Sequence, residues 1–173
     1  MTSFFRFLLL SIGLSFGSVV SGSAQDSIQI EVTSSIDQKI SHILEVKRSN
    51  CEKNAGEFKI VDRTDRFPDQ KTITEIAVDL DANIEKITII DESGFVCSDN
   101  SASYYCGSAG CRLHLVSSTD YLSLVVQGWE IIQNSYGDLI FLGALHGSFC
   151  NELGMVPCFN TIYFHGGKFV YKK

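Results

Sequence analysis

Hydrophobic positions recur at two different spacings along the chain. In the first part, after about residue 34, they recur every three or four residues with polar side chains between them, at Ile36, Ile40, Ile43 and Leu44. This spacing is typical of a helix that buries one face. Ser34 or Ser35 can cap such a helix, because a hydroxyl accepts hydrogen bonds from the free amides of the first turn. Gly56 favours a helix end just before it. The pattern therefore predicts a helix over residues 36–54.

Beyond Gly56 the chain changes to short runs that are rich in β-branched residues or alternate apolar with polar positions, which is typical of strands. The predicted strands are Glu57–Val61, Ile73–Leu80, Lys86–Ile90, Arg112–Ser117, Leu122–Gln127, Trp129–Gln133, Asp138–Leu145, Thr161–His165 and Lys168–Tyr171. Gly166 and Gly167 between the last two runs favour a two-residue hairpin turn. No helix alternates with these strands, so the pattern predicts an α+β fold in which one N-terminal helix packs on a mostly antiparallel sheet.

The first 24 residues have the pattern of an export signal. Arg6 is the only charged residue before Asp26, and the apolar run over residues 7–20 is shorter than the roughly 20 residues that a membrane span needs. The next four residues are all small, as a signal peptidase requires. We therefore predict cleavage between Ala24 and Gln25, a single domain over residues 25–173, and a periplasmic or secreted protein. An uncleaved membrane anchor is the alternative.

Charge narrows the range of partners. The chain of 173 residues has a net charge of −6, and removal of Arg6 with the signal changes it to −7. A nucleic-acid binder is not expected, because too few cations are present to neutralise a row of phosphates. An acidic surface favours a basic protein as partner through long-range steering. No second hydrophobic stretch is long enough to span a membrane, so no span is expected after signal cleavage.

Six cysteines follow the predicted cleavage site, and an even number in an exported chain indicates three disulfides. Six cysteines allow 15 pairings, and the sequence does not choose among them. The glycines between Cys106 and Cys111 and the turn residues between Cys150 and Cys158 favour two local rings. Cys51 and Cys97 then remain as the third pair.

Two other uses of the cysteines are open. Four residues separate Cys106 from Cys111, whereas a redox dithiol usually has two. The same pair with His114 has the form C-x4-C-x2-H, which could contribute three ligands to zinc. A fourth ligand is not apparent, so no metal or other cofactor is expected.

Oxygen-bearing side chains occupy alternate positions at Asp79, Asp81, Asn83 and Glu85. Calcium loops use this spacing, but they also need a glycine for a sharp turn and a bidentate glutamate at the twelfth position. Ile84 and Ile90 stand at those positions. The pattern therefore favours a turn with its acidic side toward water and with Leu80, Ala82 and Ile84 inward, and no tight calcium site is expected.

Four histidines are candidate bases: His42, His114, His146 and His165. Ser148 lies two residues after His146, which makes these two the candidate catalytic pair. A serine nucleophile usually needs a G-x-S-x-G elbow, and neither Ser108 nor Ser148 has one. We therefore assign no catalytic residue, and the alternative role of this pair is that of polar groups at a strand end.

Aromatic residues gather near the C-terminus: Phe149, Phe159, Tyr163, Phe164, Phe169 and Tyr171. Such a set either lines a recognition surface or fills the core on one face of the strands.

Several motifs together resemble a group of small exported bacterial proteins whose activity is uncharacterised. They are CEKNAGEF from Cys51, FVC from Phe95, YCGSAGC from Tyr105 and HGSFC from His146. Members of the group have a D-x-N-G-D-G loop, then C-G-x-G-G-C, then H-G-x-x-C. Here Asp79–Glu85 replaces the glycine-bearing loop, and Ala109 stands at the middle glycine of the cysteine motif. The resemblance covers residues 50–173 and implies an exported, disulfide-bonded protein without implying an activity.

These observations favour a non-enzymatic binding or inhibitory module of the cell envelope. A small periplasmic hydrolase with a histidine near the Cys150 loop is the alternative from another class. A purely structural or stress-response protein is the third possibility. A flat aromatic patch rimmed by acids would favour the binding module, whereas a pocket that holds His146 beside a carboxylate would favour the hydrolase.

Overall fold

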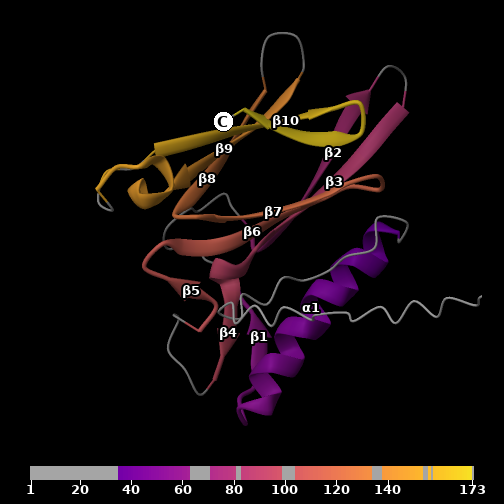
Figure 1. Ribbon diagram of the computed structural model, residues 1–173. Coiled ribbons are helices and arrows are strands. Elements are labelled where there is room, and N and C mark those ends of the chain that lie inside the picture. The colour runs from indigo at the N-terminus through magenta and orange to yellow at the C-terminus, as the bar shows by residue number, and fades with distance from the viewer. Residues whose placement is uncertain are drawn as a thin grey trace, which may run out of the picture.

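The computed structural model describes residues 35–62, 71–80, 83–98, 104–133, 138–153, 156 and 158–172. Figure 1 shows the helix α1 (Ile36–Lys53) on one side of a central sheet and the C-terminal strands on the other. In the described part of the chain, no helix has the length and apolar character needed to cross a membrane. The predicted signal, with its cleavage site between Ala24 and Gln25, lies outside the described residues.

The sequence pattern predicts α1 correctly to within a residue at its end. Ser35 is the N-cap: its hydroxyl accepts from the backbone N–H of Gln38, and the Gln38 side chain accepts from the N–H of Ser35. This reciprocal arrangement satisfies two of the amides that a helix start leaves free. The helix buries Lys39, Ile43 and Cys51 along one face, so that face packs on the strands.

The strands of the described residues form three sheets, and every strand pair among them is antiparallel. The small sheet pairs β1 (Phe58–Ile60) with β4 (Phe95–Cys97). The central sheet contains β2 (Ile73–Leu80), β3 (Asn83–Asp91), β5 (Cys106–Gly107), β6 (Gly110–Val116) and β7 (Tyr121–Val126). The outer sheet contains β8 (Gly128–Gln133), β9 (Leu139–Leu145), β10 (Cys158–His165) and β11 (Lys168–Lys172). Two short 3-10 helices, η1 (Glu92–Gly94) and η2 (Gly147–Cys150), follow β3 and β9.

The prediction of a single sheet is therefore wrong in detail, although the helix and the antiparallel pairing are confirmed. The physical reason is that the central sheet is apolar on both faces. Ile89 and Leu115 belong to one buried cluster, whereas their chain neighbours Ile90 and Val116 belong to another. Since successive side chains of a strand point to opposite faces, this sheet needs a covering layer on each side.

The two clusters show what these layers are. The larger cluster joins the central sheet to the outer sheet, with Phe141, Ile162 and Phe164 opposite Leu113 and its neighbours. The smaller cluster joins the other face of the central sheet to α1 and the small sheet through Ile43 and Phe95. The fold is thus a stack of outer sheet, central sheet and helix (Figure 1).

Three disulfides join the six cysteines in the expected pairs: Cys51–Cys97, Cys106–Cys111 and Cys150–Cys158. The first ties the last turn of α1 to β4, and both of its cysteines are buried. The second joins directly opposed residues of β5 and β6. Three disulfides indicate that the chain folds in an oxidising compartment outside the cytoplasm.

Candidate functional site

A cleft of about 690 Å³ lies between the C-terminal half of α1 and the hairpin of β5 and β6. This volume is in the range of small-molecule sites. Its lining combines cationic, amide, phenolic and small residues: Lys47, Asn50, Lys53, Asn54, Glu92, Tyr104, Tyr105, Gly107, Ala109, Gly110, Arg112 and Val125.

The polar floor of the cleft follows from the alternation of β6. Leu113 and Leu115 point into the larger core, so Arg112 and His114 point to the side of the sheet that faces α1. The Arg112 guanidinium donates a hydrogen bond of 2.9 Å to Ser123 on the neighbouring strand β7. The helix-facing side of the central sheet is therefore apolar around Val116 and polar toward Arg112.

A buried chain of polar groups supports this floor. Glu92 follows β3 directly, and its Oε1 lies 2.8 Å from Nζ of Lys47 and 2.7 Å from Nε2 of His114. Nδ1 of His114 lies 2.8 Å from the hydroxyl of Tyr121. A carboxylate only accepts, so Nε2 of the ring donates to Glu92, and the neutral ring accepts from Tyr121 at Nδ1.

The environment favours the neutral forms of the His114 imidazole and the Tyr121 phenol. Burial lowers the pKa of His114, against the opposing influence of the Glu92 carboxylate. Burial also raises the pKa of the Tyr121 phenol. Glu92 is 1% exposed and is held by two donors, so it acts as a fixed anchor for Lys47 and His114 rather than as a free base.

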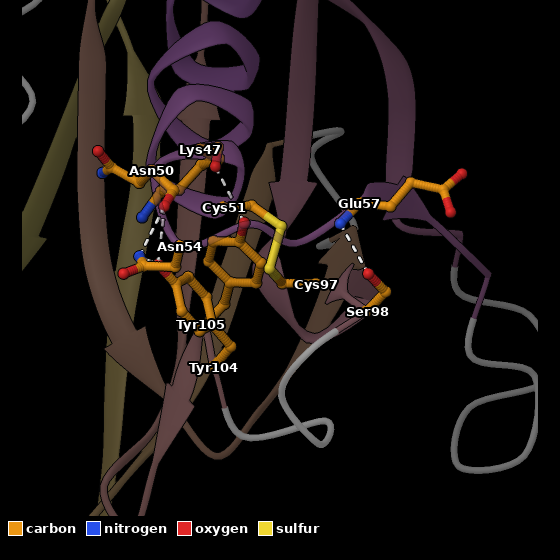
Figure 2. Close-up of a disulfide and its surroundings, with 9 residues drawn as sticks. All are labelled: Lys47, Asn50, Cys51, Asn54, Glu57, Cys97, Ser98, Tyr104 and Tyr105. Atoms are coloured by element: carbon orange, nitrogen blue, oxygen red, sulfur yellow. Dashed lines mark hydrogen bonds between the residues drawn. A yellow bond between two sulfur atoms is a disulfide. The ribbon is translucent and has the colours of Figure 1, made fainter.

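Two tyrosines form the wall beneath the end of α1 (Figure 2). The hydroxyl of Tyr105 donates to the backbone carbonyl of Lys47 at 2.9 Å, and that of Tyr104 donates to the carbonyl of Asn50 at 3.0 Å. Asn54 donates in turn to the Tyr104 hydroxyl. Burial, followed by the neighbouring Tyr104 and Glu92, raises the pKa of Tyr105 to about 12, so its hydroxyl keeps its proton and stays a donor.

The charges of the lining contrast with those of the whole chain. Three cationic side chains, Lys47, Lys53 and Arg112, face one carboxylate, Glu92, which gives the lining a net charge of +2. The chain as a whole has a net charge of −6. A cleft concentrates such a local field, so the charge of the lining favours anions over cations.

The proposed zinc ligands do not form a site in this structure. Cys106 and Cys111 are joined to each other, and Nε2 of His114 is bonded to Glu92. Among the described residues, no group of three or more histidine, cysteine or acidic side chains could hold a metal ion. The ring of Cys106 and Cys111 instead shapes one wall of the cleft.

The candidate calcium residues are also separated where they are described. Asp79 lies opposite Ile84 and Val78 lies opposite Glu85, so the two acids point to opposite faces of the hairpin. Glu85 accepts from the backbone N–H and the hydroxyl of Ser118. The expectation that Ile84 faces inward is wrong, because it is 78% exposed on the face shared with Asp79. Asp81 and the side chain of Asn83 lie outside the described residues.

The candidate catalytic pair does make contact. Nδ1 of His146 lies 2.8 Å from Oγ of Ser148, which is exposed on η2. The described residues provide no carboxylate within ion-pair distance of His146, and neither residue lines the cleft. His42 and His165 are exposed elsewhere on the surface.

The C-terminal aromatic set divides between core and surface. Phe164 and Phe169 are buried in the larger cluster. The other members of the set are exposed: Phe149, Phe159, Tyr163 and Tyr171. Neither of the two alternative roles therefore fits the set as a whole.

Sequence reasoning identified His114 but missed the residues that give the cleft its character, namely Lys47, Glu92, Tyr105 and Arg112. Three of them lie on α1, η1 and β6, and Tyr105 lies in the loop before β5, so no spacing along the chain connects them. The one local signal was the pair of acids that follows the β-branched run, Asp91 and Glu92 after Ile90.

The chain matches no protein-family model, no curated protein and no solved structure. The resemblance to a group of small exported bacterial proteins therefore stays a hypothesis. The functional assignment accordingly depends on the geometry and charge of the cleft.

Proposed function

We propose that this protein is an exported binding module that holds a small ligand in the cleft beneath the end of α1. The observation that carries the proposal is the convergence of three cationic side chains, with amides and phenols, on an open cleft of about 690 Å³. Convergent polar groups in a concave site are the usual mark of a ligand pocket. The net negative charge of the chain also favours a basic protein as a further partner.

The walls of the cleft are fixed before a ligand arrives. The Cys51–Cys97 bond anchors the end of α1, and the Cys106–Cys111 bond closes the hairpin opposite. The ion pair with Glu92 holds the Lys47 side chain, and a partly buried hydrogen bond to the Lys47 carbonyl holds Tyr105. A site that is ordered in advance loses less conformational entropy on binding, so this construction supports binding as the role of the cleft.

Binding would take place in the periplasm or outside the cell. The three disulfides support an oxidising compartment. The N-terminal pattern predicts export through a cleaved signal peptide. The intact mass of the exported product should correspond to a chain that begins at Gln25. A product that retains Met1 would contradict this route.

A ligand-detected NMR screen with a chemically diverse fragment library tests the binding function without assuming the ligand. The variant Ala109→Trp places an indole in the lining of the cleft. Ser108→Trp is the matched control, because Ser108 is exposed and lies outside the lining. We expect fragment binding to be lost in the first variant and kept in the second. Fragments that bind both variants equally, or no binding to the wild type, would refute the proposal.

The alternative, a hydrolase that uses His146 and Ser148, has one supporting observation, their 2.8 Å contact. Nucleophile activation also needs a group that orients the base. The contact between residues two apart is explained as a local hydrogen bond at the start of η2. An activity-based serine probe that labels the wild type but not Ser148→Ala would favour the hydrolase.

A further inference from the structure

We infer that the ligand of the cleft is a small organic carboxylate, with Arg112 as its principal partner; this inference rests on the proposed binding function. The lining has an excess of two positive charges within a chain of net charge −6. Such a local reversal of sign favours an anion over a neutral or cationic ligand.

The cations of the lining differ in their availability. Lys47 is neutralised by Glu92 at 2.8 Å. Within the described part of the chain, Arg112 and Lys53 have no carboxylate within ion-pair distance. Lys53 is exposed at the end of α1, whereas Arg112 is half-buried on the floor. The deeper of the two available cations is therefore Arg112.

The geometry of Arg112 suits a carboxylate. Its guanidinium has five N–H donors, and the described hydrogen bond to Ser123 fixes the side chain through Nη1. The remaining donors form a planar fork that matches the two oxygens of a carboxylate. Ser123 thus orients Arg112 for a ligand without neutralising its charge.

The size and the walls of the cleft indicate an organic anion. A volume of about 690 Å³ is far larger than a single inorganic ion. Asn50 adds a side-chain amide to the walls. The donors of Asn54 and Tyr104 are used within the protein, so these two residues offer acceptor oxygens, which can bond hydroxyl or N–H groups of a ligand. Sugar acids and acidic amino-acid derivatives share this chemistry, a carboxylate on a polar body.

Calorimetric titration of the oxidised protein with matched probes tests the inference. The pairs are glucuronate with glucose, and N-acetylglutamate with its uncharged diamide. We expect at least one acid to bind at least about tenfold more tightly than its neutral partner, and to bind more weakly as salt is raised. The acid that binds identifies the source as a sugar or an amino acid.

Arg112→Gln should weaken the binding of that acid at least about tenfold, because it removes the charged fork. Arg48→Gln is the matched control, since Arg48 lies on the same helix as Lys47 but outside the lining, and it should leave the affinity unchanged. Lys53 is exposed, so Lys53→Gln should leave the fold intact. It should weaken binding of the acid less than Arg112→Gln does.

The class assignment fails if the neutral probes bind as tightly as the acids, or if Arg112→Gln folds and binds normally. It also fails if neither acid binds at millimolar concentration. If fragments still bind in the cleft in these cases, the binding function stands and only the carboxylate assignment is lost.

Discussion

At the scale of single residues, the buried pair of Glu92 and His114 is the least expected feature of the molecule. An isolated charge in the interior is costly, and Glu92 is tolerated there because Lys47 and His114 both donate to it. His114 is held between Glu92 and Tyr121 as a neutral ring. We therefore expect the stability of the fold to depend on the protonation state of His114.

Acidification should destabilise the protein through His114. Burial lowers its pKa in the folded state, so below the ordinary value of about 6.5 the unfolded chain binds more protons. The free energy of unfolding should fall as the pH is lowered through 6.5, by at most about 1.4 kcal/mol per pH unit from this group.

Urea unfolding at several pH values measures this dependence. His114→Gln should flatten the slope below pH 6.5, because the group that takes up the proton is gone. His42→Gln, a change at an exposed helix position, should keep the wild-type slope. Equal slopes for the wild type and His114→Gln would show that another group is responsible.

Sequence patterns do not predict which single polar residues are buried or which partners they have. Lys39 is completely buried on α1 because its Nζ donates to the carbonyls of Ser117 and Ser118, 78 and 79 residues along the chain. A lysine at a helix position looks solvent-exposed until its distant partners are known. The same holds for Glu92 and Arg112, whose roles depend on neighbours from other elements.

At the scale of elements, the hairpin of β5 and β6 connects the disulfide framework to the cleft. Gly110 begins β6 with φ +117°, and a Cβ there would lie 2.0 Å from the carbonyl oxygen of Val126. Gly107 in the same ring has nothing within 4 Å of such a position. Only one of the two glycines is therefore required by the backbone.

Gly110→Ala should lower the free energy of unfolding by about 1–3 kcal/mol, because alanine is strained at this φ and collides with β7. Gly107→Ala should change it by less than about 0.5 kcal/mol. Thermal and urea unfolding of both variants under non-reducing conditions measure the difference. Similar changes in the free energy of unfolding for the two variants would contradict the special role of Gly110.

Elements were predictable where local patterns determine them. The spacing of apolar residues and the Ser35 cap identified α1, and Gly166 with Gly167 identified the last hairpin, in which both glycines have positive φ. The two-residue strand β5 is too short for any periodicity to reveal. The division into three sheets also escaped prediction, because it depends on which strands pair and not on their individual patterns.

At the scale of the whole molecule, the Cys51–Cys97 bond joins the helix to the small sheet across 46 residues of chain. The other two bonds join cysteines that lie only 5 and 8 positions apart in the chain. Since the loss of conformational freedom in the unfolded chain grows with ring size, the long bond should stabilise the fold most, by about 4 kcal/mol against about 2 and 2.5.

The double variant Cys51→Ala with Cys97→Ala should therefore lower the melting temperature more than either of the other paired replacements. It should also loosen the end of α1, where Lys47 and Asn50 line the cleft. Calorimetry of the three double variants gives the order. A larger loss on removal of the Cys106–Cys111 or Cys150–Cys158 pair would contradict the entropic account.

The location of ligand binding is the most direct test of the account. Amide chemical shifts of the oxidised protein, recorded during titration with glucuronate and with N-acetylglutamate, report where a small carboxylate binds. We expect shifts that saturate at the end of α1 and in the β5–β6 hairpin, around Lys53, Ala109 and Arg112. Shifts centred on His146 and Ser148, or no saturable shift with either acid, would contradict it.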